Sequence, residues 1–467
     1  MENREVADDR RAAVVPQPVR SRPTGPIGRL LPRSIKDLLV SRPGAASVAS
    51  NAGWLIFDRM VRMALALTVG AWVARHLGPS RFGELSYAVT LIALCQGLTN
   101  LGADGIIVRD LARNPQNAAV ILGTAFRMRL IAGVLCWTLA TVVVVLLRPQ
   151  DPNAAVLIAI IGASLVFQAA ETVDLWFQSQ SRNVWTVKAK LISYAIANAV
   201  RIGLLLSNAP LWAFAIAALI DVVLLALALA QVYRRFPVPQ PWLYSWAQGR
   251  QLLRESTPFM VGGLAALLYM RIDQLMIREM LGEQSLGFYS AAVPLSQVWA
   301  VIPVTLATAL APSIARMKAE GEEAYMAALF RVFRVFAGLS VLVTVCTALL
   351  ADSIVQALYG PAFAPAGRVL ALHVFSNIFI FMGVAQGLWL VNEGLGRVTL
   401  YRTGLGAVVC VLGNWALIPR FGLTGSAAVT VFAQFVATVA SNAIFAPRIL
   451  RLQLLSFVPP MPWRHRD

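Results

Sequence analysis

Apolar stretches of about 20 residues recur along this chain from residue 52 to residue 447, and only short polar connections separate them. A stretch of that length crosses the hydrocarbon core of a bilayer as one helix, which satisfies its own backbone hydrogen bonds there. Only 13% of the residues are charged and the mean hydropathy is +0.67, whereas soluble domains carry about twice that charge fraction. The sequence therefore predicts an all-α integral membrane protein with about twelve transmembrane helices, at residues 52–75, 84–107, 130–147, 154–178, 186–207, 210–233, 256–280, 287–312, 335–351, 365–392, 399–419 and 423–446.

An internal repeat divides these spans into two halves. Residues 77–89 read LGPSRFGELSYAV and residues 281–293 read LGEQSLGFYSAAV, so that six of thirteen positions match, where composition alone would give roughly one. Repeated halves of a polytopic chain are typical of transporters whose site lies where the halves meet. Because each half holds an even number of spans, we expect two pseudo-symmetric six-helix lobes related by an axis along the membrane normal.

The charged residues fix the expected boundaries and orientation. Of the 40 Lys and Arg residues, 30 fall on one side of the predicted spans and only six on the other. The positive-inside rule then places both termini in the cytoplasm of a multi-pass protein of the bacterial inner membrane. The predicted parts are a basic disordered tail (1–51), an N-lobe (52–233), a cytoplasmic linker (234–255), a C-lobe (256–447) and a C-terminal tail (448–467).

The net charge of +17 thus records topology and affinity for anionic membrane lipids, and we expect no nucleic-acid partner. The cysteines lie singly in different spans and the three histidines are scattered, a pattern that indicates neither a metal site nor a redox pair. The loops are too short for a soluble catalytic domain. The sequence therefore predicts no metal, no cofactor and no enzyme activity.

Arginines inside the predicted spans are the candidate substrate-binding residues. A charge at the bilayer centre costs about 2.5–3.5 kcal/mol or more, so it faces a bundle interior or a watery cavity. Arg62 lies about 15 Å into the first span, and the guanidinium fork suits bidentate binding of phosphate or carboxylate. We expect a cationic cavity for an anion such as a pyrophosphate or an acidic sugar, or alternatively salt bridges that fix helix registry. The candidate arginines are Arg59, Arg62, Arg201 and Arg271.

Carboxylates in the spans have two open interpretations, as salt-bridge partners of these arginines or as sites of H⁺ or Na⁺ coupling. Residues 168, 171, 174 and 178 form a polar stripe on one face of the fourth span, and that stripe must meet water or cations. Asp58 shares a helix face with Arg62. The candidate carboxylates are Asp58, Glu171, Asp174, Asp221 and Asp273.

Six segments resemble the bacterial polysaccharide flippases, the O-antigen and exopolysaccharide exporters of the multidrug/oligosaccharidyl-lipid/polysaccharide superfamily. The resemblance covers about residues 50–450 and follows the order of that family's helices. The segments are ARHLGPSRFGELSYA (74–88), NLGADGIIVRDLA (100–112), YMRIDQLMIREMLGEQSLGFYSAA (269–292), IPVTLATALAPSIARM (302–317), LYGPAFAPAGRVL (358–370) and IPRFGLTGSAAVT (418–430).

This resemblance implies an alternating-access flippase that moves an undecaprenyl-pyrophosphate-linked oligosaccharide from the cytoplasmic to the periplasmic leaflet. Its implied partners are the lipid-linked oligosaccharide, membrane lipids, a polysaccharide polymerase and other glycan-assembly proteins. Charged cavity residues in the family match Arg59, Arg62, Arg271 and Asp273 here. The alternatives are a multidrug or cation antiporter of the same superfamily, a lipid II flippase, and a non-transporting membrane component of glycan assembly.

Overall fold

The computed structural model describes residues 43–458, with side chains from Arg59 onward, and this part of the chain is nearly all helix, without a strand. The chain divides into two compact units, 1–59 and 60–467. Pro43–Arg59, the described part of the first unit, is helical; the packing below concerns the second. The α-helices are α2 (Pro43–Thr99), α3 (Asp104–Arg113), α4 (Ala118–Leu147), α5 (Pro152–Gly162), α6 (Ser164–Phe167), α7 (Thr172–Ser179), α8 (Asn183–Leu206), α9 (Leu211–Arg235), α10 (Trp246–Leu281), α11 (Glu283–Gln297), α12 (Val301–Glu320), α13 (Glu322–Leu349), α14 (Ala351–Tyr359), α15 (Ala364–His373), α16 (Ser376–Asn392), α17 (Gly396–Phe435), α18 (Asn442–Phe445) and α19 (Pro447–Ser456). Short 3₁₀ turns are η2 (Pro115–Asn117), η3 (Gln168–Glu171), η4 (Val298–Ala300) and η5 (Pro361–Phe363), and η6 (Val436–Ala440) is a π-helix.

Long apolar helices dominate the part of the chain that the structure describes, which confirms a multi-pass helical membrane protein. Nine helical segments there are long and apolar enough to cross a bilayer, or ten if the pair Pro361–His373 and Ser376–Asn392, bent by 44°, is one span. Two of the nine contain a non-helical residue, Gly78 in α2 and Gly422 in α17. Both glycines have positive φ, which only glycine adopts without strain.

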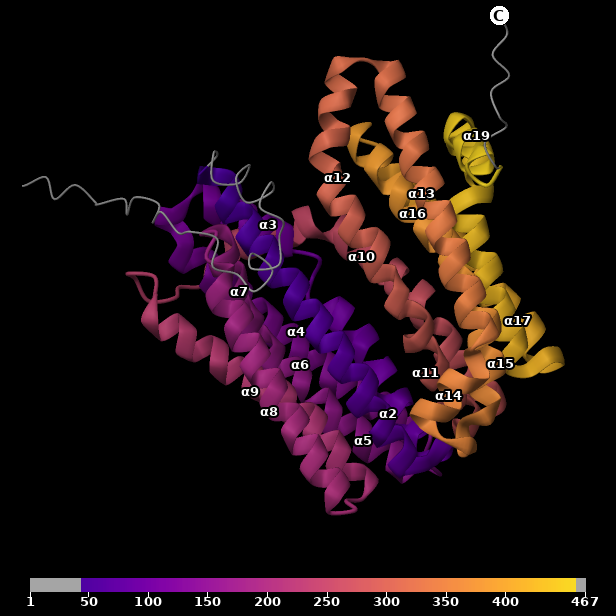
Figure 1. Ribbon diagram of the computed structural model, residues 1–467. Helices are drawn as coiled ribbons and strands as arrows, with labels where there is room; N and C mark the ends of the chain where they lie inside the picture. The colour runs from indigo at the N-terminus through magenta and orange to yellow at the C-terminus, as the bar shows by residue number, and fades with distance from the viewer. Residues whose placement is uncertain (1–42, 459–467) are drawn as a thin grey trace, which may run out of the picture. The chain divides into compact units, whose positions relative to one another are not determined.

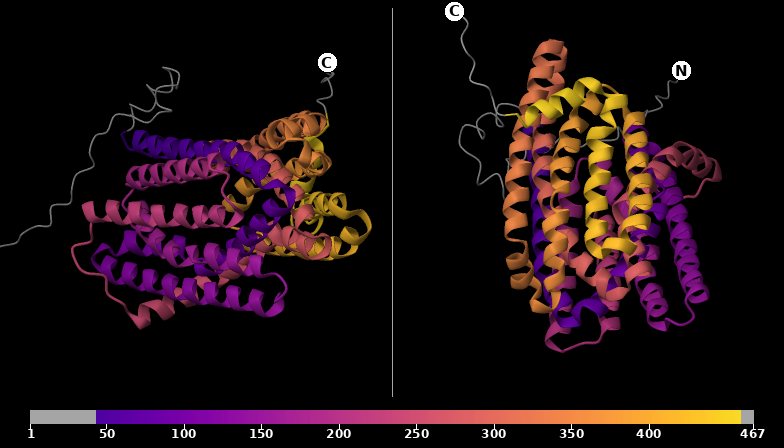
Figure 2. Two further views of the ribbon diagram at one scale, coloured as in Figure 1. Left: turned by 90° about the horizontal axis from the view of Figure 1, so that it is seen from below. Right: turned by 90° about the vertical axis from the view of Figure 1, so that its right-hand side faces the viewer.

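The helices after α2 form two packed groups. The first helix group, α3–α9, is held by contacts such as α8 on α9 and α4 on α5 and α6; the second, α11–α19, by contacts such as α13 on α16 and α11 on α15. Figures 1 and 2 show α12, α13 and α16 side by side. Between the groups, α10 packs most extensively on α17 and also contacts α3 and α4.

The helices of this unit begin and end at two opposite ends. The glycine end holds Gly78, Gly282, Gly360 and Gly422, all with positive φ at helix breaks, together with α14. The basic end holds α3, α19 and the connection between α9 and α10. Figure 1 draws α3 and α19 at its upper end and α14 near its lower end.

The internal repeat is visible in the backbone. Gly78 and Gly282 occupy equivalent repeat positions and have nearly the same torsions, φ 74° and ψ 169° against φ 86° and ψ −178°. Each is followed by a helix that carries the next repeat glycine, Gly83 or Gly287. The sequence match therefore records a real structural duplication.

The two copies of the repeat also touch each other. A Cβ on Gly83 would overlap the backbone carbonyl of Glu283, and a Cβ on Gly287 would overlap the backbone carbonyl of Pro79. Pro79 and Glu283 are themselves equivalent repeat positions, so each copy inserts its glycine against the same site of the other. This reciprocal glycine contact lets α2 and α11 approach backbone to backbone.

Ion pairs among the ends of α4 and α10 and the starts of α5 and α11 lie near the reciprocal glycine contact. Arg278 pairs with Asp151 (2.8 Å) and with Glu283 (2.6 Å), and Arg148 pairs with Glu279. The guanidinium groups of Arg148 and Arg278 lie over the ring of Tyr87, 5.3 and 5.4 Å from its centroid. Together, these side chains hold the glycine end closed between the start of α5, the end of α10 and the repeat helix in α2.

Deeper in the molecule, a polar bond continues this junction. The buried Thr90 hydroxyl of α2 donates a hydrogen bond of 2.7 Å to the side-chain oxygen of Gln274 in α10. The two residues lie 184 positions apart, so this contact fixes the register of α2 against α10.

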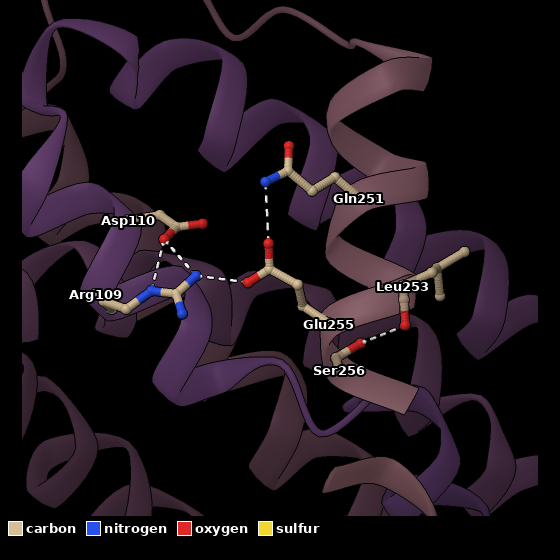
Figure 3. Close-up of polar contacts among 6 residues, drawn as sticks. All are labelled: Arg109, Asp110, Gln251, Leu253, Glu255 and Ser256. Atoms are coloured by element: carbon tan, nitrogen blue, oxygen red, sulfur yellow. Dashed lines mark hydrogen bonds and ion pairs between the residues drawn. The ribbon is translucent and has the colours of Figure 1, made fainter. Parts of the chain in front are cut away.

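At the basic end, α3 contacts the start of α10. The Arg109 guanidinium bridges Asp110 (2.8 Å) on its own helix and Glu255 (2.7 Å) on α10, as Figure 3 shows. Gln251 donates a further hydrogen bond to Glu255 at 3.0 Å. These side chains are at least one-third exposed except for Asp110, so the bridge contributes at most about 1 kcal/mol.

Several helix boundaries differ from those predicted. The second predicted span ends early, at Thr99, because Leu101 and Gly102 turn the chain with φ of 56° and 60°. The predicted linker 234–255 becomes helical at Trp246, since the Ser245 side chain caps α10 by accepting from the Gln248 amide. Its remaining residues lie against α4, where the Leu243 amide donates to the Ala119 carbonyl at 3.2 Å.

Candidate functional site

The charged residues predicted inside the spans fall into three separate groups in the described part of the chain. One group lies among α2, α8 and α9, a second among α3, α4, α7 and α8, and a third in α10 and its neighbours. Of the predicted residues, Asp58 has a side chain outside the described region, and Arg59 is exposed at the end of the first compact unit.

Tyr194 is the centre of the first group. The Arg62 guanidinium lies 4.8 Å from the centroid of the Tyr194 ring, and the Tyr194 hydroxyl donates to the Arg62 carbonyl at 3.3 Å. Arg201 lies about two turns further along the same helix and donates to Asn198, whose side-chain amide donates to the Tyr194 carbonyl at 2.7 Å. The structure thus connects Arg62 and Arg201 through Tyr194, an aromatic residue that the sequence analysis did not identify. Cation–π contacts of this kind contribute about 0.5–2 kcal/mol.

Arg201 also forms an ion pair within this group. Its Nη2 lies 2.9 Å from Asp221 Oδ2 on α9, and its Nη1 donates to Asn198 at 3.4 Å. The two ion-pair side chains are 20% and 23% exposed. Asp221 therefore neutralises Arg201 within this group.

The predicted polar stripe runs through a change of helix type. The chain tightens to the 3₁₀ turn η3 over Gln168–Glu171 and returns to α-helix in α7. A 3₁₀ helix has three residues per turn and an α-helix 3.6, so the spacing of residues 168, 171, 174 and 178 keeps all four near one face. The stripe therefore lies on a broken helix rather than on the continuous one predicted.

Basic residues meet this stripe from two other helices. Lys190 Nζ lies 2.6 Å from Asp174 Oδ2, and Gln178 donates to the same oxygen at 2.9 Å. Glu171 lies one turn before Asp174 on the same face of the stripe. Arg129 is only 4% exposed and pairs with Asp104 of α3. Both basic residues had been counted only as loop charges of the positive side.

Asp273 is the most enclosed carboxylate of the candidates, at 4% exposed. It accepts a hydrogen bond from the Tyr289 hydroxyl at 2.6 Å and one from the Gln274 amide at 2.8 Å. The Tyr289 oxygen is in turn 3.3 Å from Thr430 Oγ1 on α17. Arg271 lies on the same helix, is half-buried, and forms no hydrogen bond or ion pair within the described residues.

Two further oxygen atoms of α17 are buried without partners of their own. Asn414 Oδ1 and Ser426 Oγ, both on fully buried residues, have no hydrogen-bond partner among the described residues. Ser426 lies one turn before Thr430, whose hydroxyl donates to the Ser426 carbonyl at 3.2 Å. A carboxylate among neutral oxygens suits a proton or a small monovalent cation.

Arg402 is a buried cation that the sequence analysis counted only among the basic residues of the positive side, although it lies in the predicted span 399–419. It is 7% exposed on α17, and its Nε donates to the Ala437 carbonyl at 2.7 Å. Basic residues near the ends of predicted spans are expected to be exposed to water. The burial of this side chain was therefore not predicted. Burial against another helix is a tertiary property that its sequence position did not reveal.

The histidines and cysteines have structural surroundings. His76 Nε2 is 3.1 Å from the Ala209 carbonyl, and the buried His373 bonds Ser296 Oγ at 3.0 Å. All four cysteines are free thiols. In the described region, no cluster of three or more His, Cys, Asp or Glu side chains could hold a metal ion.

Two cavities lie beside the candidate residues of α2. One of about 270 Å³ begins at Met63, next to Arg62, and is enclosed by α2, α11 and Tyr359. Another, of about 590 Å³, lies at the glycine end and combines Trp72 with the polar side chains of Arg75, His76 and Asn208. The second has the mixture of aromatic and hydrogen-bonding groups that a polar ligand needs.

Comparison with known proteins relates the chain to proteins of polysaccharide biosynthesis. Residues 48–318 match the family described as "Polysaccharide biosynthesis protein". The capsular polysaccharide biosynthesis protein CapF of Staphylococcus aureus is 21% identical over 173 residues, which are 36% of this chain and 43% of that protein. The match thus spans less than half the length of this relative.

Solved structures of the same fold are membrane transporters of the MOP superfamily. An inward-facing MATE family multidrug resistance transporter matches with a TM-score of 0.65 and 16% identity, over 84% of this chain and 96% of that one. The lipid II flippase MurJ in an inward closed conformation matches with a TM-score of 0.63 and 12% identity, over 86% and 90%. A MOP superfamily transporter from Pyrococcus furiosus matches with a TM-score of 0.59 and 15% identity, over 87% and 96%. At these identities the likeness establishes the fold.

Proposed function

Because this chain belongs to the polysaccharide biosynthesis protein family, we propose that it is a flippase for an undecaprenyl-pyrophosphate-linked oligosaccharide, such as an O-antigen or exopolysaccharide repeat unit. The observation that carries this proposal is the family match over residues 48–318, which includes the tyrosine-centred group of Arg62 and Arg201. The fold of MOP-superfamily transporters supports movement of a substrate across the membrane, not chemistry on it.

The architecture that we propose has twelve spans in two lobes. Nine long segments, one bent pair and the two glycine breaks inside α2 and α17 add up to this number: 9 + 1 + 2 = 12. The first and second helix groups would be the bodies of the N-lobe and the C-lobe. The equivalent torsions of Gly78 and Gly282 support a pseudo-two-fold axis between them.

We infer an inward-open state from the distribution of contacts. Ion pairs and the reciprocal glycine contact close the glycine end, while the bridge from Arg109 to Glu255 at the basic end is largely exposed. The basic end carries most of the basic residues, so the positive-inside rule places it in the cytoplasm. A lipid-linked glycan would enter there, with its polyprenyl tail remaining in lipid.

The buried charged residues would then have two different roles in transport, substrate binding and ion coupling. The glycan head must cross about 30 Å of hydrocarbon, and Arg62, Arg201 and Arg271 would offer it cationic groups along the way. Asp273, enclosed by neutral oxygens of α11 and α17, would take up the coupling H⁺ or Na⁺. A cation there would neutralise the carboxylate and allow its neighbours to repack, so that ion binding and lobe movement are linked.

Transport by the purified full chain in proteoliposomes tests this function. We expect a fluorescent undecaprenyl-pyrophosphate oligosaccharide to become accessible in the opposite leaflet faster than in protein-free vesicles, and an imposed H⁺ or Na⁺ gradient to accelerate it in the parent chain but not in Asp273→Asn. Flipping of lipid II instead, or efflux of a cationic dye without glycan movement, would overturn the proposal in favour of the MurJ-like or MATE-like alternative. A change in glycan length or linkage without transport would indicate a non-transporting assembly component.

A further inference from the structure

Arg402 has a fixed orientation and an unused donor. In the π-helix η6 the Ser441 amide bonds the Val436 carbonyl, five residues back, so the Ala437 carbonyl lacks its usual amide partner. The Ala437 carbonyl accepts instead from the Ser441 hydroxyl at 2.9 Å and from Arg402 Nε at 2.7 Å. Arg402 Nη1 is enclosed and has no hydrogen-bond partner among the described residues.

Tyr269 places a second unused donor in the same region. Its hydroxyl is also enclosed without a partner in the described part of the chain. The missing side chain of Gly406, one turn after Arg402, makes room for this ring: a Cβ there would lie 3.0 Å from Ala437 Cβ and 3.1 Å from Tyr269 Cε2. Tyr269, Ala437 and the helix that carries Arg402 therefore converge on one point.

The charge at this point is uncompensated. No ion pair joins Arg402 to a carboxylate within the described residues, and Tyr269 is the ionisable group that acts on it. A buried cation without a counter-charge is costly, and an enclosed donor that makes no hydrogen bond costs about 1–3 kcal/mol. An anion with several acceptor oxygens would satisfy both donors and the charge together.

The depth of the site limits the kind of anion. Tyr269 is 14 residues further along α10 than Glu255 at the basic end, a rise of about 21 Å, so the site lies inside the membrane-spanning bundle, where the anion that reaches it belongs to a lipid. We propose that Arg402 and Tyr269 form a phosphate-binding site in the second helix group, which takes the phosphate or pyrophosphate group of a lipid. That this lipid is the glycan carrier rests on the proposed function; the site itself does not.

Binding of inorganic pyrophosphate to the detergent-purified full chain tests the site. We expect pyrophosphate to raise the unfolding midpoint of the parent chain, and Arg402→Gln to remove this increase. Arg397→Gln is the matched control, since Arg397 is an exposed arginine near the start of the same helix and should keep the full increase. Tyr269→Phe removes only the hydroxyl and should weaken binding by about tenfold.

Two further variants and lipids make the result decisive. If Arg402→Gln does not fold, Arg402→Lys, which keeps the charge but loses the planar fork, and Tyr269→Phe are compared instead. An equal pyrophosphate shift in the parent chain and in these variants, or no shift in the parent chain, would overturn the site. Stabilisation by undecaprenyl phosphate beyond that by phosphatidylglycerol would assign the carrier lipid, and equal stabilisation would assign ordinary membrane lipid. If the chain binds pyrophosphate at this site but does not flip glycan, the proposed function is rejected and the binding site is retained.

Discussion

The arginines of the spans differ in what surrounds each guanidinium group. Arg201 is held by a carboxylate at 2.9 Å, whereas Arg62 lies over an aromatic ring and Arg271 forms no hydrogen bond or ion pair in the described region. A guanidinium group that already pairs with a carboxylate is less available to a second anion. Arg271 is therefore better placed than Arg201 to exchange its present surroundings for an anionic substrate.

The double variant Arg62→Ala, Arg271→Ala should block glycan export and leave the amount of protein in the membrane normal. Loss of the two cations removes substrate attraction and leaves the ion pair between Arg201 and Asp221 in place. Export is measured by surface glycan and membrane level by immunoblot, with Arg113→Ala, an exposed arginine of α3, as the control. Wild-type export in the double variant would reject these two residues as binding groups.

Arg62→Lys separates charge from geometry at the same position. A lysine keeps the positive charge but cannot bind phosphate bidentately, so we expect partial export if the fork is used. Full export from this variant would show that attraction between charges is sufficient.

Among the elements, the two repeat glycines are the most constrained. Gly83 and Gly287 each lie against a backbone carbonyl of the other copy, and a carbonyl cannot rotate away as a side chain can. Gly70 lies on the same α2 helix with open space around it. The three glycines thus offer a comparison in which helix propensity is matched and only the contact differs.

Gly83→Ala and Gly287→Ala should each destabilise the protein by about 1–3 kcal/mol, because the added methyl group forces α2 and α11 apart. Gly70→Ala should leave stability unchanged or slightly raise it, since alanine favours a helix. Thermal unfolding of the three purified variants measures this difference. Equal midpoints for Gly83→Ala and Gly70→Ala would contradict the close contact.

For the whole molecule, the ion pairs at the glycine end decide which end is open. Arg148 and Arg278 each bind a carboxylate more than 120 residues away in sequence. One pair joins the end of α4 to the end of α10 and the other joins the start of α5 to the end of α10, so separating these helices there would require both to break. Removing them should move the population toward a state open at this end.

The variant Arg148→Ala, Arg278→Ala should increase the access of a thiol reagent to Ser290→Cys, which lines the cavity beside Met63. The reagent is added from the periplasmic side, in a background without the four native cysteines. Arg368→Ala, another arginine of the glycine end, is the control. Unchanged labelling would show that the ion pairs do not control access.

The transmembrane helices and the internal repeat could be predicted from the sequence, because both depend on patterns of residues that are close together in the chain. The 20-residue apolar segments gave the helices, and the six matching positions located Gly83 and Gly287. The contact between those glycines could not be predicted, since it depends on how helices 200 residues apart pack. Likewise, the sequence pattern did not show that Tyr194 lies under Arg62 or that the π-helix directs Arg402 inward.

The reciprocal glycine contact has a consequence for the origin of the chain. Each partner offers the other an identical surface, as in a symmetric homodimer, where one patch serves both subunits. A half-length ancestor with this patch could have paired with a second molecule of itself before gene duplication and fusion joined them. The present protein would then preserve, within a single polypeptide, the dimer interface of its forebear.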